Sequence, residues 1–501
     1  MKKALIFIII LLISSTLFTG CKKWLDVNND PNNMVEQPSI NEAVYLLGVE
    51  SEWVRQSVVE FSWWIDAEET QWLLWEAMPG ANSSSFIIGA NFGNNVWNTY
   101  TGSLKHAVNL YDLAKGNGNK RYQAIAGTIA AWNWFYLADM YDKAPLDEAL
   151  KGYEFPHPKV ATQEEIYAHG NALLDEAITL FQDPDPGTLV PGNDDYMMGG
   201  NAAKWIKLCY SLKARYAMRL TYAPGKTKAA QADLVLSYLA NGMTSNSDEC
   251  KWIHLSDKMG NCSWAYRDYL QAYTGGKGQV AGIWLVDLMN SLNDPRRYEI
   301  FTFCEADPTG FEGLQSGNVW ATGHEPSYYR LQFLWMTHPD YIMRYPECLF
   351  LKAEAYALKG DWANAQTALD AAVTADMSRS APLDFPEAMP QDSIDKYLAQ
   401  PALTIPANEE GAQELIITQK YLAGIYNSNE AYFDYIRTGY PQFDFIYALR
   451  NVTTGVTFPR RNLYPANTFT DNENIKAIGQ SDPMEGGTTW DAKPGIGPRA
   501  K

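Results

Sequence analysis

The segment 344–373 constrains the fold of this chain more than any other part of the sequence. Its apolar and small residues recur at the spacings of a tetratricopeptide repeat, in which two antiparallel helices pack around a tight turn. These residues are Leu349, Ala353, Tyr356, Gly360, Trp362, Ala365, Leu369 and Ala372. One such helix pair cannot bury its own apolar face, so further pairs must stack against it. The sequence therefore predicts an all-α scaffold of several helix pairs.

Two further regions, near 121–181 and 200–241, are the candidates for neighbouring pairs. Residues 162–165 have the form of a capping box, in which the Thr162 hydroxyl and the Glu165 carboxylate satisfy backbone amides at a helix start. Apolar residues follow at helical spacing until Asp183 and Pro184 end the helix.

The helix expected around Trp205 carries basic residues on the side opposite its apolar face. These residues are Lys204, Lys207, Lys213 and Arg219. Basic side chains at such positions are typical of a solvated face, and we expect these to be exposed.

Long irregular segments interrupt the helical pattern, and several are rich in aromatic residues. They are 79–95, 183–200, 257–278, 294–335 and 378–413, followed by a tail from residue 440 onward. Loops of this length inside a compact domain are usually functional or disordered. Because the chain has 17 Trp and 30 Tyr, and amphipathic rings in loops form platforms for flat apolar ligand faces, we expect an ordered binding surface.

Three aromatic clusters in or beside these segments supply the candidate ligand-binding residues. They are Trp75, Phe86, Asn91 and Phe92 in the first cluster, Trp264, Tyr266 and Tyr273 in the second, and Trp320, Tyr328 and Tyr329 in the third. Asparagine amides beside rings are suited to hydrogen-bond pairs of hydroxyls. Burial in the core is the alternative for each ring, and the sequence leaves it open.

The first 21 residues have the pattern of a bacterial lipoprotein leader. Lys2 and Lys3 precede an apolar run over 4–13, and Cys21 directly follows Thr19 and Gly20. This pattern predicts a signal peptide over 1–20 and a lipid-accepting Cys21 as the first mature residue. Two or more acyl chains are enough for stable anchoring to a membrane. An ordinary signal peptide followed by a chance cysteine is the alternative.

Composition and motifs exclude several classes of function. The formal net charge of −18 argues against nucleic-acid binding, which needs a concentrated basic surface. The sequence has no HExxH, GxSxG or Walker motif, and its six His residues lack metal-ligand spacing. We therefore expect no metal, no cofactor and no catalysis. Neighbouring carboxylates such as Glu68 and Glu69 leave a glycoside hydrolase as the rival function. The sequence does not decide whether Cys250 and Cys262 form a disulfide.

Short fragments in a specific order along the chain resemble a SusD/RagB-type nutrient-binding outer-membrane lipoprotein. The fragments are 24–32, 162–166, 174–177, 199–201, 211–215, 218–219, 294–296, 353–355, 437–441, 459–461 and 464–465. Together they cover nearly the whole mature chain.

The resemblance implies a mostly α fold with about four tetratricopeptide-like helix pairs and a large irregular, loop-rich half. Residues 21–501 would form a single SusD-like domain, with the helical scaffold at about 40–250 and 340–375. The loop-rich ligand-binding half would cover about 257–335 and 378–501.

The resemblance also implies a non-enzymatic protein, anchored by lipid in the outer membrane and facing the cell exterior. Such a protein binds an oligosaccharide and delivers it to a SusC-like TonB-dependent transporter. A peptide-binding protein of the same transport system is the alternative, followed by the lipoprotein glycoside hydrolase.

Replacing Cys21 with Ser is expected to abolish incorporation of radiolabelled palmitate, because the lipid-accepting thiol is removed. The measurement is autoradiography of the protein immunoprecipitated from labelled cells. Cys304→Ser is the matched control and should label like the wild type. Wild-type protein that takes up no palmitate would contradict the lipoprotein assignment.

Overall fold

The computed structural model describes residues 41–56, 76–77, 94–254, 280–304, 307–314, 327, 339–378, 389–425, 429–443, 459–479 and 487–494. By its internal contacts the chain divides into a unit over 42–501 and a separate unit over 1–41, of which only Asn41 is described. Cys21 lies outside the described residues.

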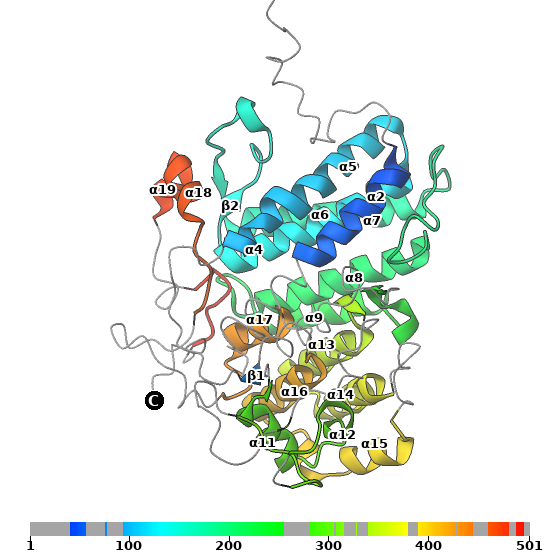
Figure 1. The fold of residues 1–501 in the computed structure, drawn as a ribbon, viewed down its shortest axis with the longest axis vertical. Helices are drawn as coiled ribbons and strands as arrows, with labels where there is room; N and C mark the ends of the chain where they lie inside the picture. Colours follow the sequence, from blue (N-terminus) through cyan, green and yellow to red (C-terminus); the bar gives the residue numbers. More distant parts are fainter. Residues whose placement is uncertain are drawn as a thin grey trace, which may run out of the picture. The chain divides into compact units, whose positions relative to one another are not determined.

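A stack of helix pairs forms the scaffold of the larger unit (Figure 1). Its helices are α2 (Glu42–Val54), α5 (Lys105–Asn117), α6 (Lys120–Tyr141), α7 (Gln163–Gln182), α8 (Ala202–Arg219), α9 (Lys228–Leu239), α13 (Tyr345–Leu358) and α14 (Trp362–Met377). From α5 onward each helix contacts the next one in this order, and α2 packs on α5. The predicted helical scaffold, with pairs near 121–181, 200–241 and 344–373, is confirmed.

Local sequence signals explain where these helices begin and turn. Thr162 and Glu165 form the predicted capping box, in which the Glu165 amide donates to the Thr162 hydroxyl (3.3 Å) and the Thr162 amide donates to the Glu165 carboxylate (2.8 Å). Helix α7 ends at Gln182, directly before Asp183. Gly360, with φ of +72°, forms the left-handed turn between α13 and α14.

Shorter elements complete the described part of the fold. The remaining helices are α4 (Asn94–Asn98), a π-helical turn (Thr99–Leu104), α11 (Ile283–Ser291), α12 (Arg297–Ile300), α15 (Gln391–Leu398), α16 (Glu409–Ala423), α17 (Asn429–Thr438), α18 (Ala466–Asp471) and α19 (Glu473–Ile478). Single 3₁₀ turns cover Gly152–Glu154, Leu220–Tyr222, Asn246–Asp248 and Pro401–Leu403. Antiparallel strand pairs join β1 (Glu76–Ala77) to β5 (Val280–Ala281), β2 (Ala144–Pro145) to β3 (Val160–Ala161), and β4 (Cys250–Trp252) to β6 (Asp340–Met343).

The segment 378–413, expected to be irregular, contains helix α15 and the start of α16. Ile394 and Tyr397 on α15 are buried and join a second core cluster with α13 and α14. Only these two of its eight residues are buried. Two apolar positions in so short a helix are too few to show a helical period in the sequence.

Two basic residues of α8 that were expected to be solvated are buried. Lys213 forms an ion pair with Asp175 of α7, and Arg219 pairs with Asp139 of α6 at 3.1 Å. Arg219 also donates to both carboxylate oxygens of Glu430 on α17, at 2.9 Å each. The expectation was wrong because these charges have carboxylate partners on neighbouring helices, which offset the cost of leaving water.

The same kind of pairing joins α13, α16 and α17. Arg437 of α17 donates to the Glu354 carboxylate of α13 at 2.7 and 2.8 Å, and to Asp434 at 2.9 Å. Asp434 lies 2.7 Å from Lys420 of α16. All four side chains are buried, so these contacts form part of the core.

Breaking one side of the Arg437–Glu354 pair is expected to destabilise the fold strongly. Arg437→Met should cost about 3–5 kcal/mol of unfolding free energy, because the Glu354 charge remains buried without its partner. Chemical denaturation measures the loss, and the double variant Arg437→Met/Glu354→Met should recover part of it.

The control for this experiment is an exposed ion pair. Lys396 pairs with Asp392 on α15, and both side chains are about three-quarters exposed, so Lys396→Ala should change stability by less than ~0.5 kcal/mol. A loss below about 1 kcal/mol in Arg437→Met would show that the buried pair does not hold the helices together.

Candidate ligand-binding region

All of the predicted ligand-binding side chains lie outside the described residues. They are Trp75, Phe86, Asn91, Phe92, Trp264, Tyr266, Tyr273, Trp320, Tyr328 and Tyr329. The structure does describe residues at which the segments that carry them begin and end. The positions of these described end residues show which of the segments lie close together where they begin or end.

Strands β1 and β5 bring two of the three aromatic segments together. Glu76 pairs with Ala281, and Ala77 pairs with Val280. Trp75 of the first cluster directly precedes β1, and the segment 255–279, which carries the second cluster, runs directly into β5. Residues about 200 positions apart in sequence therefore meet in one short sheet.

The third aromatic segment is attached at the same point. The Ala281 amide donates to the Ser327 carbonyl at 3.0 Å, and the Leu314 amide donates to the Ala281 carbonyl at 2.9 Å. Segment 315–326, with Trp320, lies between Leu314 and Ser327, and Tyr328 follows Ser327. We name residues 76–77, 280–283, 312–314 and 327 the Ala281 junction. All three predicted aromatic clusters lie on segments that leave this junction.

Gly313 allows its backbone to lie close to the backbone of Ile283 at the junction. The Ile283 amide donates to the Leu314 carbonyl at 3.0 Å. A Cβ atom at Gly313 would lie 2.4 Å from the Ile283 Cα atom and 2.6 Å from its amide nitrogen. Both clashes are with backbone, so no side-chain movement relieves them, and only glycine fits.

Exposed aromatic rings occur next to the junction, at positions that the sequence analysis did not single out. Tyr298 is 52% exposed and Phe303 is 39% exposed. Each has its ring centroid 5.2 Å from that of Phe311, which leads into Gly313 and Leu314. We name Tyr298, Phe303 and Phe311 the Tyr298 ring cluster. The sequence does carry a signal there, because 298–311 holds four aromatic residues, Tyr298, Phe301, Phe303 and Phe311.

Buried and partly buried polar contacts fix the backbone that carries the Tyr298 ring cluster. Arg296 is buried and pairs with Asp294 at 2.6 Å and with Asp376 of α14 at 3.0 Å. The next residue, Arg297, donates to the Asn290 side chain at 2.6 Å, and its guanidinium lies 5.8 Å from the centre of the Tyr298 ring. The cluster is therefore attached to the scaffold through α14 and to α11.

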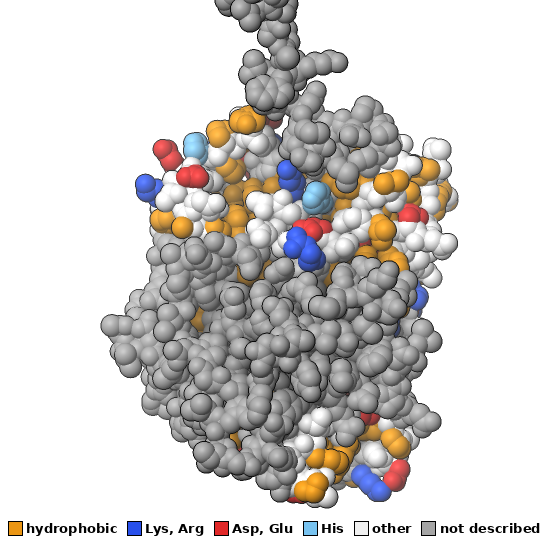
Figure 2. Space-filling view, viewed as in Figure 1, with side chains coloured by type: hydrophobic (Ala, Val, Ile, Leu, Met, Phe, Trp, Pro, Cys, Tyr) orange, Lys and Arg blue, Asp and Glu red, His pale blue; other side chains and the backbone are white. Residues whose placement is uncertain are grey.

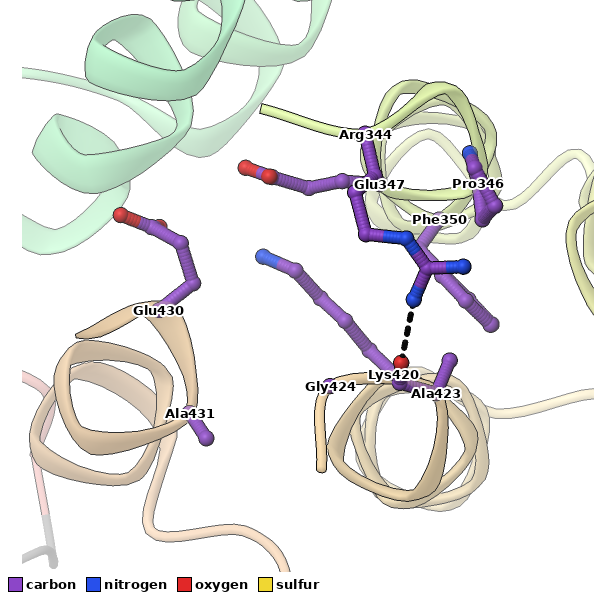
Figure 3. A pocket seen from close by; sticks show the side chains of 9 residues that line it. All are labelled: Arg344, Pro346, Glu347, Phe350, Lys420, Ala423, Gly424, Glu430 and Ala431. Atoms are coloured by element: carbon purple, nitrogen blue, oxygen red, sulfur yellow. Dashed lines mark hydrogen bonds between the residues drawn. The ribbon is translucent and has the colours of Figure 1, made fainter. Parts of the chain in front are cut away.

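A small pocket lined by both apolar and charged side chains lies between α13, α16 and α17 (Figure 3). The charged ends of Glu347, Lys420 and Glu430 point toward one another in it. Burial alone lowers the pKa of Lys420, but the Asp434, Glu347 and Glu430 carboxylates raise it overall. The accessible space is about 30 Å³, enough for one or two water molecules and too small for a sugar ring. This pocket therefore belongs to the buried ion pairs of the core.

The described residues also provide evidence on metal binding, on the state of Cys250 and on surface charge. No group of three or more His, Cys, Asp or Glu side chains in the described ranges is arranged to hold a metal ion. Cys250 is a buried free thiol whose pKa is raised by burial, and Cys262 lies outside the described residues. On the face drawn in Figure 2, the coloured side chains mix acidic, basic and apolar types, and the described surface has no extended basic patch there.

Comparisons with known proteins agree with this fold. A family model for SusD-like proteins, described as starch-binding and associating with the outer membrane, matches residues 67–465. A SusD/RagB family protein of Bacteroides thetaiotaomicron is 25% identical, with 90% of this chain and 99% of that chain covered and a TM-score of 0.73.

Two further solved structures share the fold at lower identity. A SusD homologue of Bacteroides uniformis is 22% identical, with 90% of this chain and 99% of that one covered and a TM-score of 0.72. A protein described as chitin-binding is also 22% identical, with 90% and 100% covered and a TM-score of 0.73. A comparison with curated proteins finds no significant match.

Because the family model spans most of the chain, this protein belongs to the SusD-like family. The resemblance inferred from the sequence fragments is thereby confirmed. The family is associated with the outer membrane. Among the described helices, none combines the length and the apolar character needed to cross a bilayer.

Adding a methyl group at Gly313 is expected to disrupt the Ala281 junction. Gly313→Ala should lower the unfolding free energy by about 1–3 kcal/mol, because the new Cβ overlaps the backbone at Ile283. Thermal or chemical denaturation measures the effect.

The matched control is a glycine with open space around it. Gly48 lies in the middle of α2 with no atom within 4 Å of an added Cβ, so Gly48→Ala should raise stability by about 0.5–1 kcal/mol. Equal effects of the two alanine substitutions would show that the junction tolerates the extra atom.

Proposed function

We propose that this protein is a cell-surface lipoprotein that binds an oligosaccharide at aromatic side chains around the Ala281 junction. It then delivers the oligosaccharide to a SusC-like TonB-dependent transporter and catalyses no reaction itself. The single observation that supports the binding site most strongly is the attachment of three aromatic-rich segments to one junction.

The side chains around this region suit a sugar. A pyranose ring has an apolar face of C–H groups, which stacks on aromatic rings, and a rim of hydroxyls, which needs polar partners. The Tyr298 ring cluster provides exposed rings with the Arg297 guanidinium beside them. The family description as starch-binding and the chitin-binding relative of similar fold also favour a glycan.

The expected affinity suits capture followed by release. A ring–ring contact contributes about 0.5–1.5 kcal/mol beyond area burial, and we take a similar value for a ring–sugar contact. A few such contacts together with buried area give dissociation constants between about millimolar and micromolar. This affinity concentrates a nutrient at the surface and still allows transfer to a transporter.

Calorimetry against a panel of soluble ligands tests the proposal. The panel holds maltohexaose, chitohexaose, cellohexaose, xylohexaose, mannohexaose and a tryptic casein digest. At least one hexasaccharide is expected to bind with a dissociation constant between about 1 µM and 1 mM. Tyr298→Ala should weaken that binding about two- to tenfold, because it removes the most exposed ring of its cluster.

Tyr153→Ala provides the matched control, since Tyr153 is fully exposed and lies on the Gly152–Glu154 turn outside the proposed site. Its affinity should equal that of the wild type. Heat from the peptide digest alone would favour the peptide-binding alternative, and shortened sugars after long incubation would favour the hydrolase. No hexasaccharide binding at millimolar concentration would contradict the proposal.

A further inference from the structure

A further pair of aromatic rings, Trp252 and Tyr196, lies at the sheet of β4 and β6. In this antiparallel pair Trp252 lies opposite Asp340, and Lys251 lies opposite Tyr341. Directly opposite residues project from the same face of a sheet. Trp252 and Asp340 therefore share one face, where the Asp340 carboxylate also lies 2.8 Å from Nε2 of His254.

Tyr196 adds a second ring beside Trp252. It comes from the connection between α7 and α8, and its ring centroid lies 4.5 Å from that of Trp252, tilted by 49°. Its hydroxyl donates to the Ile253 carbonyl at 2.6 Å, and this bond lies at the surface. Both rings are only partly buried, so part of each remains accessible.

Buried polar contacts hold Tyr196 in place. Its amide donates to the carboxylate of Glu50 at 2.9 Å, and Glu50 on α2 is fully buried. The neighbouring Asp195 accepts hydrogen bonds from the amides of Met198 and Gly200, at 2.8 Å each, and from the Trp205 indole at 2.7 Å. A ring fixed in this way loses little conformational freedom when a ligand binds.

The β4–β6 sheet is linked along the chain to the Ala281 junction by two of the aromatic segments. Segment 255–279, with the second cluster, runs from His254 to Val280 of the junction. Segment 328–338 runs from Ser327 of the junction to residue 339, directly before β6. Segments 255–279 and 328–338 therefore each connect the Ala281 junction with the sheet that carries Trp252.

We propose that Tyr196 and Trp252 form a second stacking subsite, which takes a further sugar ring of the oligosaccharide bound at the Ala281 junction. This inference rests on the proposed function. The two rings supply the apolar contact, and the Tyr196 hydroxyl with the Asp340–His254 pair supplies polar partners for the sugar hydroxyls. This combination matches the apolar face and polar rim of a pyranose.

Binding of the hexasaccharides named above to ring variants tests the subsite. Trp252→Ala should weaken calorimetric binding of the bound hexasaccharide about two- to tenfold, because one stacking contact is lost. Trp252→Phe retains an aromatic face and should stay within about twofold of the wild type. Tyr153→Ala remains the exposed-ring control, and melting curves establish that each variant is folded.

The outcomes separate the subsite from the proposed function. If Trp252→Ala binds like the wild type while Tyr298→Ala binds more weakly, the subsite is wrong and the proposed function stands. If the wild type binds no hexasaccharide, both fall.

A measurement on the unaltered protein covers the case in which Trp252→Ala does not fold. Hydroxyl-radical labelling of Trp252 and Tyr196 should decrease when the bound hexasaccharide is added. Equal labelling with and without the sugar would overturn the subsite.

Discussion

Buried arginine–carboxylate pairs join scaffold helices that lie far apart in the sequence. Arg215 of α8 pairs with Glu347 of α13, and Arg219 pairs with Glu430 of α17, across 132 and 211 residues of sequence. Each charge gives up its hydration on folding, so a pair is favourable only when its geometry is complete, and a half-formed pair is strongly destabilising. We infer that these pairs select one arrangement of the helices, and that apolar burial supplies most of the stability.

The sequence was most informative where the structure is local. The capping box at Thr162, the turn at Gly360 and the helix pairs near 121–181, 200–241 and 344–373 follow from spacing alone and are confirmed. The fragments that identified the family, among them 211–215, 218–219, 294–296, 353–355 and 437–441, contain several of the buried charges of the core. Their residue types were visible in the sequence. Their pairing was not, because it joins residues far apart in the chain, and Lys213 and Arg219 were therefore wrongly expected in solvent.

The candidate site could be predicted only in part for the same reason. Aromatic density indicated which segments are of interest, but their meeting point depends on backbone hydrogen bonds of Ala281, Leu314 and Ser327, which no residue pattern reveals. The side chains predicted as ligand contacts lie outside the described residues and remain predictions. Tyr298 and Trp252 were missed because a residue pattern does not show which rings stay exposed, and the fold supplies their partners, Phe311 and Tyr196.

The described structure thus combines a helical scaffold joined by buried ion pairs with short sheets at which the aromatic-rich segments begin and end. Hydrogen–deuterium exchange of the full chain, with and without the hexasaccharide that binds most tightly, tests whether the ligand binds at the short sheets and not at the scaffold helices. We predict slower exchange on ligand addition in the Ala281 junction, the Tyr298 ring cluster and the β4–β6 sheet, with no change in α6, α7 and α13. Slower exchange confined to the scaffold helices, with none at the junction, would contradict the account.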